Sequence, residues 1–170
     1  MISELIKYSK EKFVDTFDFI YAVGYFGDLL AGLVSIFILL GNWGYLASYL
    51  ILFLLDVFIN KLLKNAIKQL RPPNPIKFLN KDRFVKSKRP FGMPSGHSEN
   101  VFFSLTFIYL FFHRINAWII LLGVIGIITM YQRYTFHNHT ITQLIMGAIV
   151  GSVFGYLAYK LTTTIINLRS

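Results

Sequence analysis

Five apolar runs follow one another along the chain, at residues 18–41, 45–63, 97–112, 115–131 and 141–160. Each is close to the ~20 residues that an α-helix needs to cross a hydrocarbon core of ~30 Å. The pattern therefore predicts an all-α, multi-pass transmembrane helical bundle of about five helices. The third and fourth runs are short, so one of them can also be interpreted as a buried or tilted element.

The composition agrees with lipid as the surrounding solvent. Of the 170 residues, 55% are hydrophobic and 15% are charged, which is too apolar for a soluble domain of this length. The sequence has no Gly/Ser-rich linker and no repeat, so we expect a single domain over residues 1–170. Residues 1–17 alternate apolar and charged positions, which suits either a helix lying on the membrane surface or a solvated tail. The absence of cysteine excludes disulfides and thiolate chemistry.

The positive charge is concentrated in one segment. The net charge is +9, and residues 61–89 contain ten lysines or arginines against one acid, Asp82. A nucleic-acid site is the least favoured explanation, because a short loop between spans offers only Phe78, Phe84 and Phe91 for base stacking. The positive-inside rule explains most of these charges. An anion site at the membrane surface is compatible with it, so the rule does not settle the orientation of the chain.

Two basic residues near the end of the second run can converge on one anion. Lys64 and Arg71 are seven residues apart, so on a helix they lie within ~20° of one face, with Asn60 on the same stripe. Pro72 and Pro73 then end the helix, because the residue before a proline is pushed out of the α region. Taken alone, these side chains are also explained as complements of the helix dipole or as interfacial residues.

A second polar block, Pro94-Ser95-Gly96-His97, comes directly before the third run. A tight turn at a helix start directs its N–H groups outwards, and glycine lets a bulky anion approach, so the Ser95 and Gly96 amides are a candidate phosphate site. His97, on the first helical turn, can exchange a proton with a bound group. The simpler alternative is a helix cap with an interfacial histidine.

The third block joins the fourth and fifth runs. Arg133 leaves the fourth helix, Asn138 is a candidate N-cap, and His139 would begin the fifth helix. Gln143 follows four residues later on the same face, where its carbonyl can accept a hydrogen bond from His139 and leave the other ring nitrogen with a free lone pair. In an up-and-down chain the loops after helices two and four lie on the same side of the membrane, so the three blocks can meet.

Together the three blocks resemble the type 2 phosphatidic acid phosphatase (PAP2) superfamily, which shares a catalytic core with vanadium haloperoxidases. The superfamily pattern is lysine, six residues, Arg-Pro; then Pro-Ser-Gly-His; then Ser-Arg, five residues, His, three residues, Asp. Residues 64–72, 94–97 and 133–139 follow it in order and spacing. The resemblance implies a PAP2/haloperoxidase-like helical core.

Two positions depart from this pattern. Gln132 stands where the superfamily has serine, and Gln143 stands where it has aspartate. The departure is itself similar to the dolichyl diphosphatases, which carry a His-Thr-x-x-Gln sequence like residues 139–143 and a Gly-Met-Pro-Ser-small-His-Ser block like residues 92–98. That resemblance implies a polyprenyl diphosphate substrate and, in a eukaryotic cell, the endoplasmic reticulum membrane. Phosphatidate or another lipid phosphate, and a catalytically silent lipid-phosphate binder, remain as alternatives.

The resemblance also implies a role for each site residue. His139 would be the nucleophile that forms a phosphohistidine, and His97 would be the general acid. Gln143 would orient His139. The phosphate oxygens would be held by Lys64, Arg71, Arg133 and the amides of Ser95 and Gly96. The substrate would be a lipid phosphate within the membrane, and we expect no metal, no other cofactor, no nucleic acid and no obligate protein partner.

Several titratable residues remain outside this scheme. His137, two residues before His139, is an alternative nucleophile, although an apolar residue follows it four positions later. His113 is expected at the far membrane surface. Asp28 and Asp56 are intramembrane acids without an assigned partner, and for both a structural hydrogen bond is favoured over catalysis.

Overall fold

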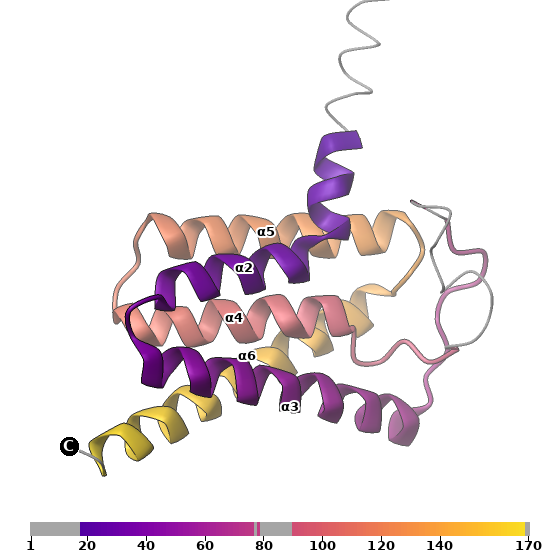
Figure 1. The fold of residues 1–170 in the computed structure, drawn as a ribbon. Helices are drawn as coiled ribbons and strands as arrows, with labels where there is room; N and C mark the ends of the chain where they lie inside the picture. The colour runs from indigo at the N-terminus through magenta and orange to yellow at the C-terminus, as the bar shows by residue number, and fades with distance from the viewer. Residues whose placement is uncertain (1–17, 77, 79–89, 169–170) are drawn as a thin grey trace, which may run out of the picture.

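The computed structural model describes residues 18–76, 78 and 90–168, and this part of the chain folds as an all-α bundle (Figure 1). Its labelled helices are α2 (Gly27–Leu39), α3 (Trp43–Ile67), α4 (Gly96–Phe112), α5 (Ala117–Thr135) and α6 (Ile141–Asn167). Each of them overlaps one of the five apolar runs, so the prediction of an all-α bundle is confirmed. Residues 1–17, for which the sequence predicts a surface helix or a solvated tail, lie outside the described part.

The first apolar run predicts one helix, but the structure divides it in two. A helical segment, Asp18–Tyr25, meets α2 at an angle of 67° and stands away from the bundle in Figure 1. Gly24 and Gly27 flank this bend and pack directly on α5, where an added Cβ atom would collide with Gln132 and Thr129, respectively. The two glycines therefore allow the bend to lie against α5, and α2 begins beside the last turns of that helix.

The number of membrane spans is smaller than the number of helices. Among the described residues, α3, α5 and α6 are long and apolar enough to cross a membrane, and the bent pair of Asp18–Tyr25 with α2 can supply a fourth span. Helix α4 has 17 residues and corresponds to a run that the sequence pattern left open as a buried element. By length and composition, the described part of the chain therefore supports three spans, or four with the bent pair, and not the five that the apolar runs predict.

Helix α4 lies at the centre of the bundle and contacts each of the other four labelled helices. Three glycines of α6, Gly147, Gly151 and Gly155, are spaced four residues apart and face the main chain at the start and along the length of α4. A Cβ atom on any of them would collide with a backbone carbonyl oxygen. Small residues at this spacing let two helix backbones approach closely in a membrane, so the stripe sets the distance between α4 and α6.

The bundle is apolar outside and partly polar inside. Ile51 is 66% exposed, and Leu54 and Ile127 are each 68% exposed. The largest buried side chains include polar ones, namely those of Glu99, Gln132, Arg133, Asn138 and Gln143. This distribution is expected of helices that face lipid and enclose a polar site, because polar groups in a membrane turn to the bundle interior.

Candidate active site

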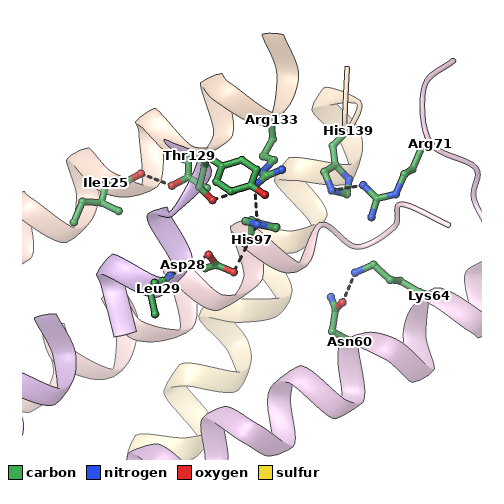
Figure 2. A network of polar contacts seen from close by, with 11 residues as sticks. Asp28, Leu29, Asn60, Lys64, Arg71, His97, Ile125, Thr129, Arg133 and His139 are labelled. Atoms are coloured by element: carbon green, nitrogen blue, oxygen red, sulfur yellow. Dashed lines mark hydrogen bonds and ion pairs between the residues drawn. The ribbon is translucent and has the colours of Figure 1, made fainter. Parts of the chain in front are cut away.

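The candidate site lies where five helix ends meet. Helices α3 and α5 end there, and α2, α4 and α6 begin there (Figures 1 and 2). A pocket of about 510 Å³ lies between them, within the size range of small-ligand sites. Its walls are formed by Asp28, Val57, Asn60, Lys61, Lys64, Asn65, Arg71, Pro90, Phe91, Gly96, His97, Asn100 and His139. All three sequence blocks thus contribute to one place.

The two ring nitrogens of His139 have separate partners. Nδ1 lies 3.1 Å from Oε1 of Gln143, and Nε2 lies 2.9 Å from Nη1 of Arg71. A guanidinium can only donate, so Nε2 accepts from Arg71 and Nδ1 carries the proton that is donated to Gln143. The hydrogen bond predicted between His139 and Gln143 is therefore present, and it leaves the lone pair of Nε2 directed at Arg71 and the pocket.

The environment of His139 keeps its ring neutral. The residue lies in the loop between α5 and α6 and is only 3% exposed. Burial, followed by the positive charges of Arg71 and Lys64, holds the pKa of His139 well below its usual value. Each of these effects disfavours the imidazolium form. At neutral pH the imidazole is therefore in the form that can act as a nucleophile.

The side chain of Gln143 connects three parts of the site. Its Oε1 also accepts from the backbone N–H of Thr140 at 3.3 Å. Its Nε2 donates to the backbone carbonyl of Leu70 at 2.8 Å and to Oε1 of Gln69 at 3.2 Å. A carboxylate could make neither of the last two bonds, because it has no donor. An amide at position 143 thus fits its surroundings, although the superfamily pattern has aspartate there.

Helix α6 begins later than the sequence predicts. Asn138 is the predicted N-cap and His139 the predicted first helical residue, whereas the N-cap is Thr140 and the helix begins at Ile141. Oγ1 of Thr140 accepts from the N–H of Gln143 at 3.2 Å, and the two residues form a capping box. The contact of His139 with Gln143 therefore comes from this cap and not from a shared helical face.

Arg71 reaches the pocket from outside α3, so the prediction that Lys64 and Arg71 share one helical face is wrong. The helix ends one residue before Lys68, which adopts a left-handed backbone with φ of 53°. The following segment pairs with the chain before α4, where the N–H of Arg71 donates to the carbonyl of Pro90 at 3.0 Å. From there Nη1 of Arg71 also donates to the carbonyl of Asn138 at 2.9 Å.

The second block offers the pocket the amide of Gly96, not that of Ser95. The N–H of Ser95 donates to the backbone carbonyl of Gln143 at 3.0 Å, and Ser95 is fully buried, so the amide that the sequence predicts to bind phosphate already has a partner in the structure. Gly96 begins α4, where the first amides of a helix suit an anion. An added Cβ atom there would lie 3.2 Å from Oδ1 of Asn60 and 3.4 Å from Nζ of Lys64, so a larger residue would occupy the space in front of them.

His97 lies between a cation and an acid on the first turn of α4. Nη2 of Arg133 donates to Nε2 of His97 at 2.7 Å and to the carbonyl of Tyr25 at 3.1 Å. Arg133 is 1% exposed and is not among the residues that line the pocket, so in the structure it contacts His97, whereas the sequence predicts that it holds the phosphate. Oδ2 of Asp28 lies 3.8 Å from the same Nε2 atom (Figure 2).

A buried polar chain holds Lys64 at the pocket. Nζ of Lys64 donates to Oδ1 of Asn60 (Figure 2), and Nδ2 of Asn60 donates to Oε2 of Glu99. Glu99 is fully buried and does not line the pocket. Asn60 therefore connects the pocket cation to an inner carboxylate. Asp56 is 1% exposed, lies beside Glu99 and is also outside the pocket lining.

Lys61, Gln69 and Asp28 are among the residues of the site that the sequence did not predict. Lys61 lines the pocket three residues before Lys64, and this helical spacing is a signal that could have revealed it. Gln69 contacts Gln143 only because of the path that the chain takes after α3. Asp28 reaches the pocket because of the bend before α2.

The remaining histidines lie away from the pocket. His137 has a left-handed backbone with φ of 52°, is exposed, and is not part of the pocket lining. His113 lies at the opposite end of α4, where its Nε2 is 2.9 Å from Oη of Tyr159. Gln132 is buried and packs against Gly24. The geometry therefore favours His139 over His137 as the candidate nucleophile.

A neutral buried histidine, a second histidine and several cations thus surround one pocket in a bundle with an apolar exterior. These features define a membrane site for an anionic group such as a phosphate, with a nitrogen nucleophile beside it. The model of the PAP2 superfamily matches residues 45–166 of the chain. The chain belongs to the PAP2 superfamily and is an integral membrane protein, as its motifs predict.

Comparisons with known proteins agree with this assignment. The chain is 29% identical over 108 residues to lipid phosphate phosphatase gamma of Arabidopsis thaliana, which covers 58% of this chain and 45% of the relative. It is 29% identical over 115 residues to dolichyldiphosphatase of Saccharomyces cerevisiae, which covers 62% of this chain and 47% of the relative. The chain thus spans a little under half the length of these two curated relatives.

A solved structure shows the same fold. The crystal structure of a transmembrane PAP2 type phosphatidylglycerolphosphate phosphatase from Bacillus subtilis superposes with a TM-score of 0.64 at 21% sequence identity. The match covers 86% of this chain and 76% of the bacterial chain. The transmembrane helical fold predicted from the apolar runs is therefore confirmed.

Proposed function

We propose that the protein is a membrane lipid phosphatase that removes the terminal phosphate of a polyprenyl diphosphate through a phosphohistidine at His139. The observation that carries this proposal is the geometry of His139, whose Nδ1 lies at Oε1 of Gln143 and whose Nε2 lies at a cation-lined pocket. The names of the two curated relatives, a lipid phosphate phosphatase and a dolichyldiphosphatase, support a lipid phosphate as the substrate.

In the first step, Nε2 of His139 attacks the terminal phosphorus. Arg71 donates to this nitrogen in the structure, but the charged oxygens of a phosphate are a stronger acceptor for a guanidinium. When Arg71 turns to the phosphate, the lone pair of Nε2 becomes available. The N–P bond forms as the P–O bond to the leaving group breaks, while Lys64, Arg71 and the Gly96 amide hold the nonbridging oxygens.

Proton transfer is assigned to His97. In the first step, protonated His97 gives its proton to the leaving oxygen. In the second step a water molecule attacks the phosphorus, the N–P bond breaks, and His97 takes up the proton of that water. Gln143 keeps the Nδ1–H of His139 in place through both steps, so that the same ring nitrogen is always the one that carries the phosphoryl group.

The charge of the pocket supports a diphosphate over a monophosphate. Within the described part of the chain, Lys61, Lys64 and Arg71 line it, against one acid, Asp28. A diphosphate carries more negative charge than a monophosphate, and three cations can bind it with less uncompensated positive charge. The similarity of residues 92–98 and 139–143 to dolichyl diphosphatases supports the same choice, and with it the endoplasmic reticulum membrane as the location in a eukaryotic cell.

Phosphatidate is the second candidate substrate, because one curated relative is named a lipid phosphate phosphatase. Release of inorganic phosphate by the purified chain in detergent, from dolichyl diphosphate and from phosphatidate at equal mole fraction, separates the two. We expect faster release from the diphosphate, no loss of activity in EDTA, and inhibition by vanadate, which mimics the phosphoryl-transfer state. Faster release from phosphatidate would identify phosphatidate as the preferred substrate of the two. No release from either lipid would contradict the proposal and favour a silent lipid-phosphate binder.

A further inference from the structure

Among the residues that the structure describes, Asp28 is the one acid that lines the pocket, and the proposed mechanism gives it no part. Its Oδ2 lies 3.8 Å from Nε2 of His97 (Figure 2). We propose that Asp28 is the positioning residue that stabilises the protonated form of His97 and draws its ring away from Arg133 towards the pocket. This inference rests on the phosphatase function proposed above.

The structure shows His97 bound as a neutral base. Nη2 of Arg133 lies 2.7 Å from Nε2 of His97, and a guanidinium has only donors. Nε2 therefore holds no proton while this hydrogen bond exists. A general acid must hold a proton, and a ring that is protonated at Nε2 can no longer accept from Arg133. For its proposed role, His97 must therefore exchange Arg133 for another partner.

Most charges around His97 oppose its protonation. The positive charges of Arg133 on α5, Lys64 on α3 and Arg71 after α3 all repel an imidazolium, and His139 adds to them when it is charged. Asp28 on α2 is the acid that faces the ring within ion-pair distance in the described part of the chain. An opposite charge at this distance favours the charged form of a titratable group. The Asp28 carboxylate thus offsets part of the repulsion from the surrounding cations.

Burial in the bundle disfavours the carboxylate form of Asp28, but Arg133 and hydrogen bonds to its side chain favour that form. Asp28 lies in the first turn of α2, where the positive end of the helix dipole stabilises a carboxylate. Its Oδ1 accepts from the backbone N–H of Leu29 at 2.9 Å. Its side chain is 26% exposed at the pocket, so water also reaches it. Oδ2 is the oxygen that points to His97.

The two partners define two positions for the His97 ring. The neutral ring accepts from Arg133, and the protonated ring pairs with Asp28. In the first chemical step the proton passes from His97 to the leaving oxygen, and the ring returns to Arg133. In the second step the ring takes up a proton from the attacking water and returns to Asp28, which itself neither gains nor loses a proton.

The test is the pH dependence of kcat in Asp28→Asn, which keeps the shape of the side chain and removes its charge. We expect the alkaline limb to move to lower pH, because the general acid loses its proton more readily, and kcat at pH 8 to fall about tenfold or more. KM should not rise, since Asp28 binds no phosphate oxygen. Asp28→Glu, which restores the charge, should restore much of the alkaline limb.

Asp18→Asn is the matched control, because it makes the same change at an exposed position of the helical segment before α2. It should keep the wild-type profile. If Asp28→Asn also keeps that profile, or loses activity equally at every pH without recovery in Asp28→Glu, the inference is overturned while the phosphatase function stands. If the wild-type chain releases no phosphate from any lipid phosphate, the proposed function fails and the inference fails with it.

Discussion

The backbone N–H of Ser95 donates to the backbone carbonyl of Gln143 at 3.0 Å, which joins the start of α4 to the first turn of α6. The side chain of Gln143 holds His139, and His97 lies two residues after Ser95. The two candidate catalytic histidines are therefore carried by segments that are bonded to each other. Their relative position depends on how closely α4 and α6 pack.

The glycine stripe of α6 should control that packing. In Gly151→Ala the new Cβ atom would collide with the backbone carbonyl of Glu99, so α4 must shift. Overpacking of this kind costs about 1–3 kcal/mol, and we expect a lower unfolding temperature together with a lower kcat. Gly123→Ala on α5 is the control, since its Cβ would meet no atom within 4 Å. Equal behaviour of the two variants in thermal unfolding and turnover would contradict the role of the stripe.

The amide of Gln143 should be needed both to orient the ring of His139 and to keep position 143 uncharged. Gln143→Ala releases the ring of His139, and loss of an orienting partner of this type lowers activity about 10- to 100-fold. Gln143→Glu keeps an acceptor for Nδ1–H but loses the donors to Gln69 and Leu70. Its negative charge would raise the pKa of His139, so the acid limb of kcat/KM should move to higher pH. An unchanged profile in both variants would remove Gln143 from the mechanism.

Arg71 should contribute to the low pKa of His139, and its replacement should therefore shift the pH dependence of activity. The neutral ring is the reactive form, so activity is lost as the pH falls through the pKa of His139, and that limb should lie below the usual value of about 6.5. Arg71→Gln removes one of the positive charges that lower this pKa. We expect weaker activity and an acid limb at higher pH than in wild type. Substrate ionisation is the same for both proteins, so an identical limb would contradict the assignment.

Asn60 should be required for the position of Lys64. Asn60→Ala removes the two hydrogen bonds that link Lys64 to Glu99. Hydrogen bonds to charged groups contribute about 1.5–3 kcal/mol each, so kcat/KM should fall about 10- to 100-fold. Asn42→Ala is the control, because Asn42 is exposed at the other end of α3 and makes no capping bond with its side chain. A wild-type kcat/KM in Asn60→Ala would show that Lys64 is positioned by other contacts.

The helices were predictable because runs of apolar residues determine them, and the three motif blocks were recognisable from the identity and spacing of their residues. Apolar runs of helical length lead to helices in lipid, and the order of the runs brings alternate loops to the same side. The bond between His139 and Gln143 was also predicted correctly, although for a different reason. The four-residue spacing suggested a helical face, whereas a capping box at Thr140 creates the contact.

The errors arise where main-chain geometry between elements decides. The left-handed backbone of Lys68 ends α3 before Arg71, and no apolar pattern marks that residue. The amide of Ser95 is satisfied by a carbonyl of α6, a partner far away in sequence. Asp28 faces His97 because Gly24 and Gly27 allow a bend against α5. Each case depends on tertiary contacts that a single sequence does not display.

The proposed mechanism requires that His139 becomes phosphorylated during turnover. The direct test is to mix the purified chain with a lipid substrate labelled in its terminal phosphate, stop the reaction rapidly in alkali, and locate the covalent phosphate by peptide mass spectrometry. We expect label on His139 in wild type and in His137→Ala, and no labelled protein in His139→Ala. Label on His137, or a labelled phosphoenzyme that persists in His139→Ala, would contradict it.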